Sequence, residues 1–350
     1  MEKTIQLLDA TIRDGGLGFE DAAKNGLAAL RFEEETLRRM VDCMRRSRVD
    51  IVELGSIERS EEDKRGFGIF QSIRDISRLI PPDRSPGQMY AALYRGPDTP
   101  LEDIPPWNPS LCESVRVILR YSELQKSLDF CAALAKKGYQ VFVQPMLTMR
   151  YTEAELHKVV DAANRMGAYA LYFVDSYGYM EREDVLRFFR TFDTGLAPGI
   201  RLGFHAHNNM ELAFANARTF LEQETRRGLI VDACAMGLGQ GAGNLQTEVI
   251  ADLLNRRYGQ NYEYSAILEL CEIVDRYWPD AVWGYSVERF LPARHRAAYK
   301  YAVVMRRGRG LSFAEIDRVL ENMPKELRQR YTPENLARVL RDAGIAGGAS

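Results

Sequence analysis

The chain has 350 residues, 46% of them hydrophobic and 27% charged, with a formal net charge of −2 at pH 7. A chain of this length can bury a large core, while its near-neutral balance gives no reason to expect a nucleic-acid or acidic membrane partner, and no apolar run has the ~18 residues that a membrane span needs. Five scattered cysteines without CxxC spacing and a start without a secretory signal predict a cytoplasmic protein with reduced thiols.

Short apolar strands alternate with amphipathic helices over the first three quarters of the chain. We predict strands over residues 4–8, 49–54, 88–94, 115–119, 139–145, 169–174, 200–204 and 230–235. Several of these strands are almost free of charge, which is typical of a parallel sheet covered on both faces. Eight strands alternating with helices favour a (β/α)8 TIM barrel over an open sheet.

Helical spacing of apolar residues predicts the elements between the strands. We expect helices over 33–47, 64–79, 121–137, from 152 onward, and over 181–192, 209–222 and 243–258. Thr152, with Glu155 three residues later, forms a capping box. The many prolines of 96–109 leave room for one helical turn at most, so the helix between the third and fourth strands is predicted to be degenerate.

Beyond the barrel the pattern becomes helical without further strands. Residues 265–277, 286–305, 312–322 and 333–342 are the candidate helices. We therefore divide the chain into a catalytic barrel (1–258), a C-terminal helical region (259–343) and a flexible tail (344–350).

The first strand runs directly into charged residues and two glycines. Arg13 and Asp14 follow the apolar run, and Gly15-Gly16 predicts a sharp turn after them. In a barrel the functional face is where strands end, because the loops gather there. This strand end is therefore a candidate edge of an active site.

Two of the four histidines of the chain follow the seventh strand. His205 and His207 are two residues apart, so on an extended chain they face the same way, about 6–7 Å apart, and can reach one ion. The alternative is a pair of satisfied polar histidines. Barrel closure brings the first strand close, so Asp14, with Asn244 as a further candidate, completes an oxygen and nitrogen set suited to Mn²⁺, Mg²⁺, Co²⁺ or Zn²⁺.

Further polar residues stand at other strand ends. Glu53 ends the second strand, where it either orders the water shell of a metal or forms a structural ion pair with Arg13. Gln144 ends the fifth strand and Ser176 follows the sixth, and both are candidates for substrate contacts, although the segment around Ser176 also suits an ordinary turn. The glycines of 237–244, after the eighth strand, let the backbone approach a ligand.

The strand-end motifs resemble those of the DRE-TIM metallolyases, the family of HMG-CoA lyase, isopropylmalate and homocitrate synthases, and 4-hydroxy-2-oxovalerate aldolase. The matching motifs are LDATIRDGG (8–16), VELGS (52–56), VDSYG (174–178), GFHAHNN (203–209) and GLGQGAGN followed by TEV (237–249). They extend over the whole barrel, and the last two are nearly those of the aldolase branch.

The resemblance implies that Asp14, His205 and His207 hold a divalent metal, with Mn²⁺ as the first expectation. Asn244 as a further ligand better matches the acyl-CoA lyases. Arg13 would stabilise the enolate oxygen of pyruvate. The expected activity is that of a carbon–carbon lyase, an aldolase acting on a 4-hydroxy-2-oxo acid.

Two other functions compete with this expectation: a Claisen-type acyl-CoA lyase or synthase of the same superfamily, and a non-catalytic barrel. The expected partners are a small 2-oxo acid and an aldehyde, and the helical region would mediate a homodimer or dock an aldehyde dehydrogenase. The sequence does not specify the aldehyde, the metal or the direction of reaction.

The chain departs from the aldolases at the general base. Those enzymes carry a histidine shortly after the RDG motif, paired with a C-terminal tyrosine, whereas this chain has Leu17 at that position. The tyrosine is matched to Tyr285. The base is therefore Tyr285 alone, or His295, predicted to lie on the same helix, or Glu53, or a water on the metal.

Overall fold

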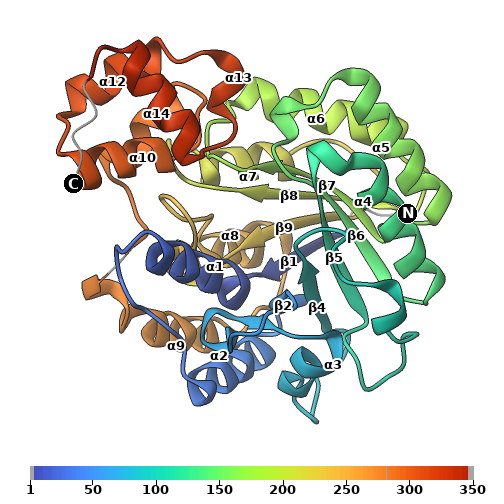
Figure 1. Ribbon diagram of the computed structural model, residues 1–350. Helices are drawn as coiled ribbons and strands as arrows, with labels where there is room; N and C mark the ends of the chain where they lie inside the picture. Colours follow the sequence, from blue (N-terminus) through green and yellow to red (C-terminus); the bar gives the residue numbers. More distant parts are fainter. Residues whose placement is uncertain (1–3, 281, 346–350) are drawn as a thin grey trace.

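The computed structural model describes residues 4–280 and 282–345, and within them eight parallel strands close into a barrel (Figure 1). The strands follow the order β1-β9-β8-β7-β6-β5-β4-β2 around the barrel, and pairing of β1 with β2, Leu8 opposite Ile51, closes it. The predicted TIM barrel is therefore confirmed. The barrel strands are β1 (Ile5–Asp9), β2 (Ile51–Ile57), β4 (Met89–Tyr94), β5 (Ser114–Leu119), β6 (Gln140–Pro145), β7 (Ala170–Asp175), β8 (Arg201–Ala206) and β9 (Leu229–Ala233).

Helices surround the barrel and connect its strands. Those that precede the C-terminal region are α1 (Thr11–Lys24), α2 (Glu34–Ser47), α3 (Ile73–Ile76), α4 (Leu124–Lys136), α5 (Glu153–Met166), α6 (Arg182–Gly195), α7 (Ala213–Leu221) and α8 (Thr247–Tyr258). The capping box of Thr152 and Glu155 begins α5 as predicted. Between β4 and β5 a single 3₁₀ turn, Leu101–Asp103, stands where a degenerate helix was expected.

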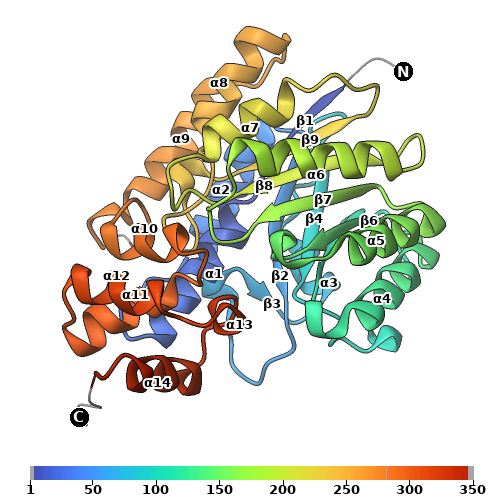
Figure 2. The same ribbon diagram turned by 90° about the horizontal axis from the view of Figure 1, so that it is seen from above.

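The C-terminal helices form a second packing unit on one side of the barrel. They are α10 (Val287–Arg294), α11 (Lys300–Val303), α12 (Phe313–Glu321), α13 (Lys325–Arg328) and α14 (Pro333–Asp342). Figure 2 shows them gathered away from α4 and α5. Their apolar side chains, among them Leu291, Tyr301 and Leu320, form a core separate from that of the barrel.

The helix α9 (Tyr264–Asp275) packs with the barrel although it follows the predicted boundary at residue 258. Its buried side chains Ile267, Leu270 and Val274 belong to the apolar core that surrounds the barrel. The C-terminal core begins only at Leu291. The proposed division of the chain at residue 258 thus describes the end of the strand–helix alternation, whereas the packing changes about thirty residues later.

The C-terminal unit contacts the loops that follow the barrel strands. The Tyr177 hydroxyl, in the loop after β7, donates to the backbone carbonyl of Gln329 at 2.8 Å. The side-chain amide of Asn209, after β8, donates to the backbone carbonyl of Arg289 at 3.3 Å. The unit therefore covers the strand ends on one side of the barrel.

The predicted turn at Gly15-Gly16 is wrong, because both glycines lie inside helix α1. A Cβ on Gly16 would stand 1.9 Å from the backbone oxygen of Phe67, and one on Gly15 would stand 2.4 Å from a methyl carbon of Leu238. The glycines therefore permit close packing of a helix, rather than a change of chain direction.

The predicted helix over 64–79 is also wrong. Gly68 has a φ of +62° and interrupts it, and the segment divides into 3₁₀ turns, the short strand β3 (Ile69–Phe70) and α3. β3 pairs with β2, Ser56 opposite Ile69, outside the barrel. The backbone of Gly68 packs on α1, since a Cβ there would lie 2.8 Å from the Ile12 carbonyl oxygen.

The single helix predicted over 286–305 is broken between α10 and α11. Arg296 has a φ of +54°, which ends the helical path. Two side chains at the end of α13 bind the backbone carbonyls at this break. Arg328 donates to His295 O at 3.0 Å, and Gln329 donates to Arg296 O at 2.9 Å. Tyr285 and His295 do not share a helix either, because Tyr285 precedes α10 and His295 follows it.

Two remaining features concern the termini and membranes. Of the predicted tail 344–350, residues 346–350 lie outside the described residues. No helix within the described ranges combines the length and apolarity that crossing a membrane requires.

Candidate metal centre

The start of α1 is held by the end of β1 and by the loop after β9. Asp9, the last residue of β1, accepts hydrogen bonds from the Thr11 backbone N–H at 2.9 Å and from the Thr247 hydroxyl at 2.7 Å. The Thr11 hydroxyl in turn accepts from the Ala235 N–H at 2.8 Å. These bonds fix the first turn of α1, which carries Asp14, over the carboxyl ends of the strands.

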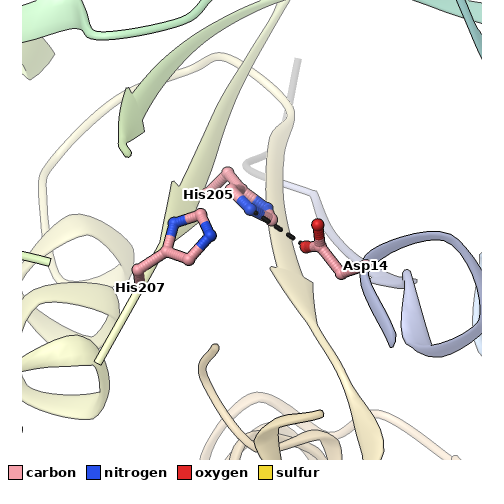
Figure 3. A group of neighbouring side chains, drawn as sticks. All are labelled: Asp14, His205 and His207. Atoms are coloured by element: carbon pink, nitrogen blue, oxygen red, sulfur yellow. Dashed lines mark ion pairs between the residues drawn. The ribbon is translucent and has the colours of Figure 1, made fainter. Parts of the chain in front are cut away.

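Asp14, His205 and His207 converge on one point (Figure 3). Each offers one ligand atom, and these atoms lie within 4.8 Å of one another. His205 Nε2 stands 3.2 Å from Asp14 Oδ2, and the two imidazole rings have centroids 5.0 Å apart. The structure thus brings together three residues from α1, the end of β8 and the loop after it, as the sequence predicts.

Both histidines are oriented by their other ring nitrogen. His205 Nδ1 bonds Asp232 Oδ2 at 2.9 Å, and His207 Nδ1 bonds the carbonyl oxygen of Asp175 at 3.0 Å. A carbonyl only accepts, so His207 Nδ1 carries the proton and its Nε2 has a free lone pair. Such outer bonds are what fixes the ring and tautomer of a metal-ligating histidine.

Two buried oxygens at this point lack a hydrogen-bond donor among the described residues: Asp14 Oδ2 and Asn244 Oδ1. Asn244 forms a β-bridge with His207, and its Nδ2 donates to Leu238 O at 3.1 Å, which leaves Oδ1 free. A Cβ on Gly239 would fill this space, 2.1 Å from Asn244 Nδ2. Buried polar atoms without partners are costly, and a divalent cation bound by two oxygens and two imidazoles would satisfy them.

The electrostatics favour the deprotonated forms of Asp14 and His207, whereas at His205 burial lowers the pKa but the carboxylates of Asp14 and Asp232 outweigh it and raise that pKa. Burial, together with the neighbouring His205, lowers the pKa of His207 to about 4. Burial raises the pKa of Asp14, but Arg13 and His205 outweigh it and hold that pKa well below its usual range. Metal ligands must be deprotonated, and these two are so at neutral pH.

Arg13 stands beside this group and is held by two carboxylates. Its Nε donates to Glu53 Oε2 at 2.8 Å, and its Nη1 bonds Asp14 Oδ1. Of the two roles predicted for Glu53, the structure contains the ion pair with Arg13. Glu53 is fully buried, and its Oε1 has no donor among the described residues.

Three functional candidates escaped the sequence analysis: Arg116 on β5, Asp232 on β9 and Tyr172 on β7. Arg116 Nη1 donates to Glu53 Oε2 at 2.6 Å, and its Nη2 bonds Asp232 Oδ2. Tyr172 donates to Asp232 Oδ1 at 2.9 Å. A signal was present, because Arg116 and Asp232 are single charged residues inside otherwise apolar strands.

The two residues predicted to contact substrate are engaged by the protein. With its amide oxygen facing the guanidinium, Gln144 accepts from Arg116 Nη2 at 2.9 Å and from Nε at 3.1 Å. Ser176 Oγ accepts from the Leu147 N–H at 2.8 Å, which orders the loop after β6.

The two candidates from the C-terminal region stand apart from the grouped ligands. Tyr285 is 56% exposed, in the segment before α10. His295 directly follows α10, and its Nε2 lies 2.7 Å from Asp317 Oδ1 on α12. Of the residues proposed as general base, only Glu53 belongs to the buried network around Arg13.

Parts of the chain are similar in sequence to the HMGL-like family and to 4-hydroxy-2-oxovalerate aldolases. Residues 115–274 match the HMGL-like family. Over 257 residues the chain is 26% identical to the 4-hydroxy-2-oxovalerate aldolase of Geobacillus genomosp. 3, an alignment that covers 73% of this chain and 72% of that enzyme. With the 4-hydroxy-2-oxovalerate aldolase of Shewanella woodyi it is 40% identical over 151 residues, covering 39% of this chain and 43% of that enzyme.

A comparison of structures agrees on the fold. The HMG-CoA lyase of Brucella melitensis superimposes with a TM-score of 0.59 at 17% identity, covering 78% of this chain and 98% of the lyase. At that identity the likeness concerns the fold alone. The sequence matches confirm the resemblance to the metallolyases that the strand-end motifs predict.

Proposed function

We propose that this chain is a divalent-metal-dependent aldolase, which cleaves or forms a carbon–carbon bond in a 4-hydroxy-2-oxo acid through a pyruvate enolate. The observation that carries the proposal is the convergence of Asp14, His205 and His207 beside a buried guanidinium, that of Arg13. The names of the aldolase relatives support the same reaction class.

In this proposal Asp14, His205, His207 and Asn244 hold the cation. Mn²⁺ is our first choice, with Mg²⁺, Co²⁺ and Zn²⁺ as alternatives, since an oxygen and nitrogen donor set accepts all four. The cation supplies Lewis-acid polarisation of the 2-oxo group of the substrate. The free oxygens of Asp14 and Asn244 are already buried, so binding the ion costs little further desolvation of the protein.

Arg13 would act on the charge that develops during the reaction. In the cleavage direction the 4-hydroxyl loses its proton, the C3–C4 bond breaks, the aldehyde leaves, and the electron pair of the bond forms the pyruvate enolate. A guanidinium held by Glu53 and Asp14 is preorganised to stabilise that negative charge. Protonation of C3 then yields pyruvate.

Four candidates are proposed as the group that accepts the proton of the 4-hydroxyl: Glu53, Tyr285, His295 and a water on the cation. Glu53 has the advantage of position, because its unpartnered Oε1 is on the carboxylate that binds Arg13. Ser176 and Gln144 stay as proposed substrate contacts; both would have to exchange or share the protein hydrogen bonds that they now accept.

The substrates are small molecules in this proposal, a 2-oxo acid and an aldehyde. A homodimer, an aldehyde dehydrogenase partner and a cytoplasmic location are proposed from the same resemblance. The proposal is tested by incubating the protein with Mn²⁺, pyruvate and a panel of aldehydes that includes sugar aldehydes, with products identified by mass spectrometry. We expect a 4-hydroxy-2-oxo acid with at least one aldehyde and its disappearance when a chelator is added.

Two results would count against the proposal. If no aldehyde of the panel reacts with any of the four metals present, the aldolase assignment fails. If a short acyl-CoA panel is cleaved or condensed instead, the Claisen-type alternative replaces it.

A further inference from the structure

Arg116 is the largest side chain buried without any exposure in the described structure, and it carries a charge. It projects from β5, which is three strands from β1 around the barrel. Its Nη1 donates to Glu53 on β2, and its Nη2 bonds Asp232 on β9. Burying a charge is costly, and even a paired and hydrogen-bonded buried charge is weak evidence for stability. The burial of Arg116 therefore calls for a role other than stabilising the fold.

The contacts of Arg116 complete a closed ring of six side chains. Starting from Arg116, Glu53 leads to Arg13, and Asp232 leads to His205. Asp14 joins the two arms, because it bonds Arg13 through Oδ1 and stands 3.2 Å from His205 through Oδ2. We call this the inner ring; acids alternate with arginines and a histidine around it in the order Asp14, Arg13, Glu53, Arg116, Asp232, His205.

Arg116 occupies the position in the ring opposite Asp14. Glu53 connects it to the guanidinium of Arg13, and Asp232 connects it to the imidazole of His205. Two further contacts hold the guanidinium of Arg116 in place. It lies 4.9 Å from the ring centroid of Tyr172, and Gln144 accepts hydrogen bonds from its Nε and Nη2. A planar fork can bind two carboxylates at once, which a lysine ammonium cannot do with the same geometry.

We propose that Arg116 is a positioning residue that couples the two halves of the centre, since it orients Arg13 through Glu53 and His205 through Asp232. The inference rests on the proposed function, because it assumes that His205 binds the cation and that Arg13 binds the enolate. Arg116 itself touches neither ligand nitrogen and acts only through the two carboxylates.

This role predicts two losses from one substitution. In Arg116→Lys the charge stays, but one ammonium replaces the fork, so Glu53 and Asp232 are no longer held together. Mn²⁺ affinity should fall by about 10–100-fold, the usual effect of losing a partner behind a metal ligand. Affinity of the Mn²⁺-loaded protein for oxamate, a planar mimic of the pyruvate enolate, should fall by roughly tenfold, because Arg13 loses its fixed orientation.

Single substitutions in the two arms separate these effects. Asp232→Asn should weaken Mn²⁺ binding and leave oxamate binding nearly unchanged at saturating metal. Glu53→Gln should leave the Mn²⁺ affinity nearly unchanged and weaken oxamate binding. The matched control is Arg95→Lys, since Arg95 also joins two carboxylates, those of Glu20 and Glu58, but outside the inner ring; its Mn²⁺ affinity should stay within about twofold of the wild type.

The measurements are isothermal titration calorimetry with Mn²⁺ and then oxamate, with thermal melting of the metal-free proteins as a check on folding. An Arg116→Lys protein that folds and binds both probes within about twofold of the wild type overturns the proposal. If Arg116→Lys does not fold, the two arm variants decide: equal effects on both probes in both variants would overturn it. Failure of the wild type to bind Mn²⁺ would instead refute the proposed function.

Discussion

The inner ring has a counterpart at the mouth of the barrel. The two rings differ in whether their carboxylate oxygens all have hydrogen-bond donors. Glu20 on α1 and Glu58 after β2 alternate with Lys64 and with Arg95 after β4 in a second closed circuit, which we call the outer ring. Its four ion pairs span 2.5–3.2 Å. Each carboxylate oxygen of the outer ring has a cationic donor.

The inner ring is buried and leaves Asp14 Oδ2 and Glu53 Oε1 without donors among the described residues, whereas the outer ring is partly exposed and complete. Alternating charge alone therefore does not mark a site. The free lone pairs of Asp14 and Glu53 support the proposed site, because a protein normally satisfies its buried acceptors. The outer ring has the simpler role of tying α1 to the loops after β2 and β4.

The largest effect is expected from Asp14→Asn. The amide offers one neutral oxygen in place of an anionic ligand, so Mn²⁺ affinity should fall by roughly 100-fold or more, and aldolase activity by roughly 1,000-fold. Calorimetry and the product assay measure the two quantities. Asp252→Asn, on the exposed side of α8, is the control and should change neither. Wild-type metal affinity in Asp14→Asn would remove Asp14 from the centre.

A smaller effect is expected from Gly239→Ala. The added Cβ would stand 2.1 Å from Asn244 Nδ2 and 3.5 Å from the Asp14 Cβ, so the amide must move and carry Oδ1 with it. Mn²⁺ affinity should drop by about tenfold while the melting temperature changes little. Gly308→Ala meets nothing closer than 3.7 Å and serves as the control. Unchanged affinity would mean that Asn244 is not a ligand.

The outer ring should affect stability and not metal binding. Burial raises the pKa of Glu20, but the bond with Lys24 and the charges of Arg95 and Lys64 outweigh it and lower the pKa to about 2. A depressed carboxyl pKa stabilises the fold above the unfolded value, near pH 4.5, and this stabilisation is lost as the pH falls toward 2.

Glu20→Gln should therefore lower the free energy of unfolding at pH 7 by about 2 kcal/mol and flatten its decline in acid. Denaturant titration between pH 7 and 3 measures both, and the Mn²⁺ affinity should not change. A variant that unfolds with the same pH profile as the wild type would show that the outer ring contributes no stability.

The smallest effect is expected at Lys24, which contacts Glu20 from outside the outer ring. Lys24 is mostly exposed and shares Glu20 Oε1 with Lys64. Removing it in Lys24→Ala should cost less than about 0.5 kcal/mol, the usual value of an exposed i,i+4 pair. The same denaturant titration at pH 7 applies, and a loss as large as that of Glu20→Gln would mean that Lys24 and not the ring holds Glu20.

The sequence was sufficient to predict the barrel and the Asp14–His205–His207 group, because strand periodicity and strand-end position depend on local pattern and known topology. It was misleading at Gly15-Gly16, because these glycines are needed for close packing against Phe67 and Leu238, which are distant in the chain. Arg116 and Asp232 were missed for a related reason. Which charges meet across a barrel interior depends on register between strands that are not adjacent in sequence.

The central claim is that the inner ring is a metal-dependent enolate site, and exchange of the pyruvate methyl protons with deuterium oxide tests it most directly. The exchange is followed by NMR with the wild type and Arg13→Ala, each with Mn²⁺ and with chelator. We predict exchange only in the wild type with Mn²⁺, because enolate formation needs both the cation and the guanidinium. Exchange that persists with chelator, or at the wild-type rate in Arg13→Ala, would contradict the claim.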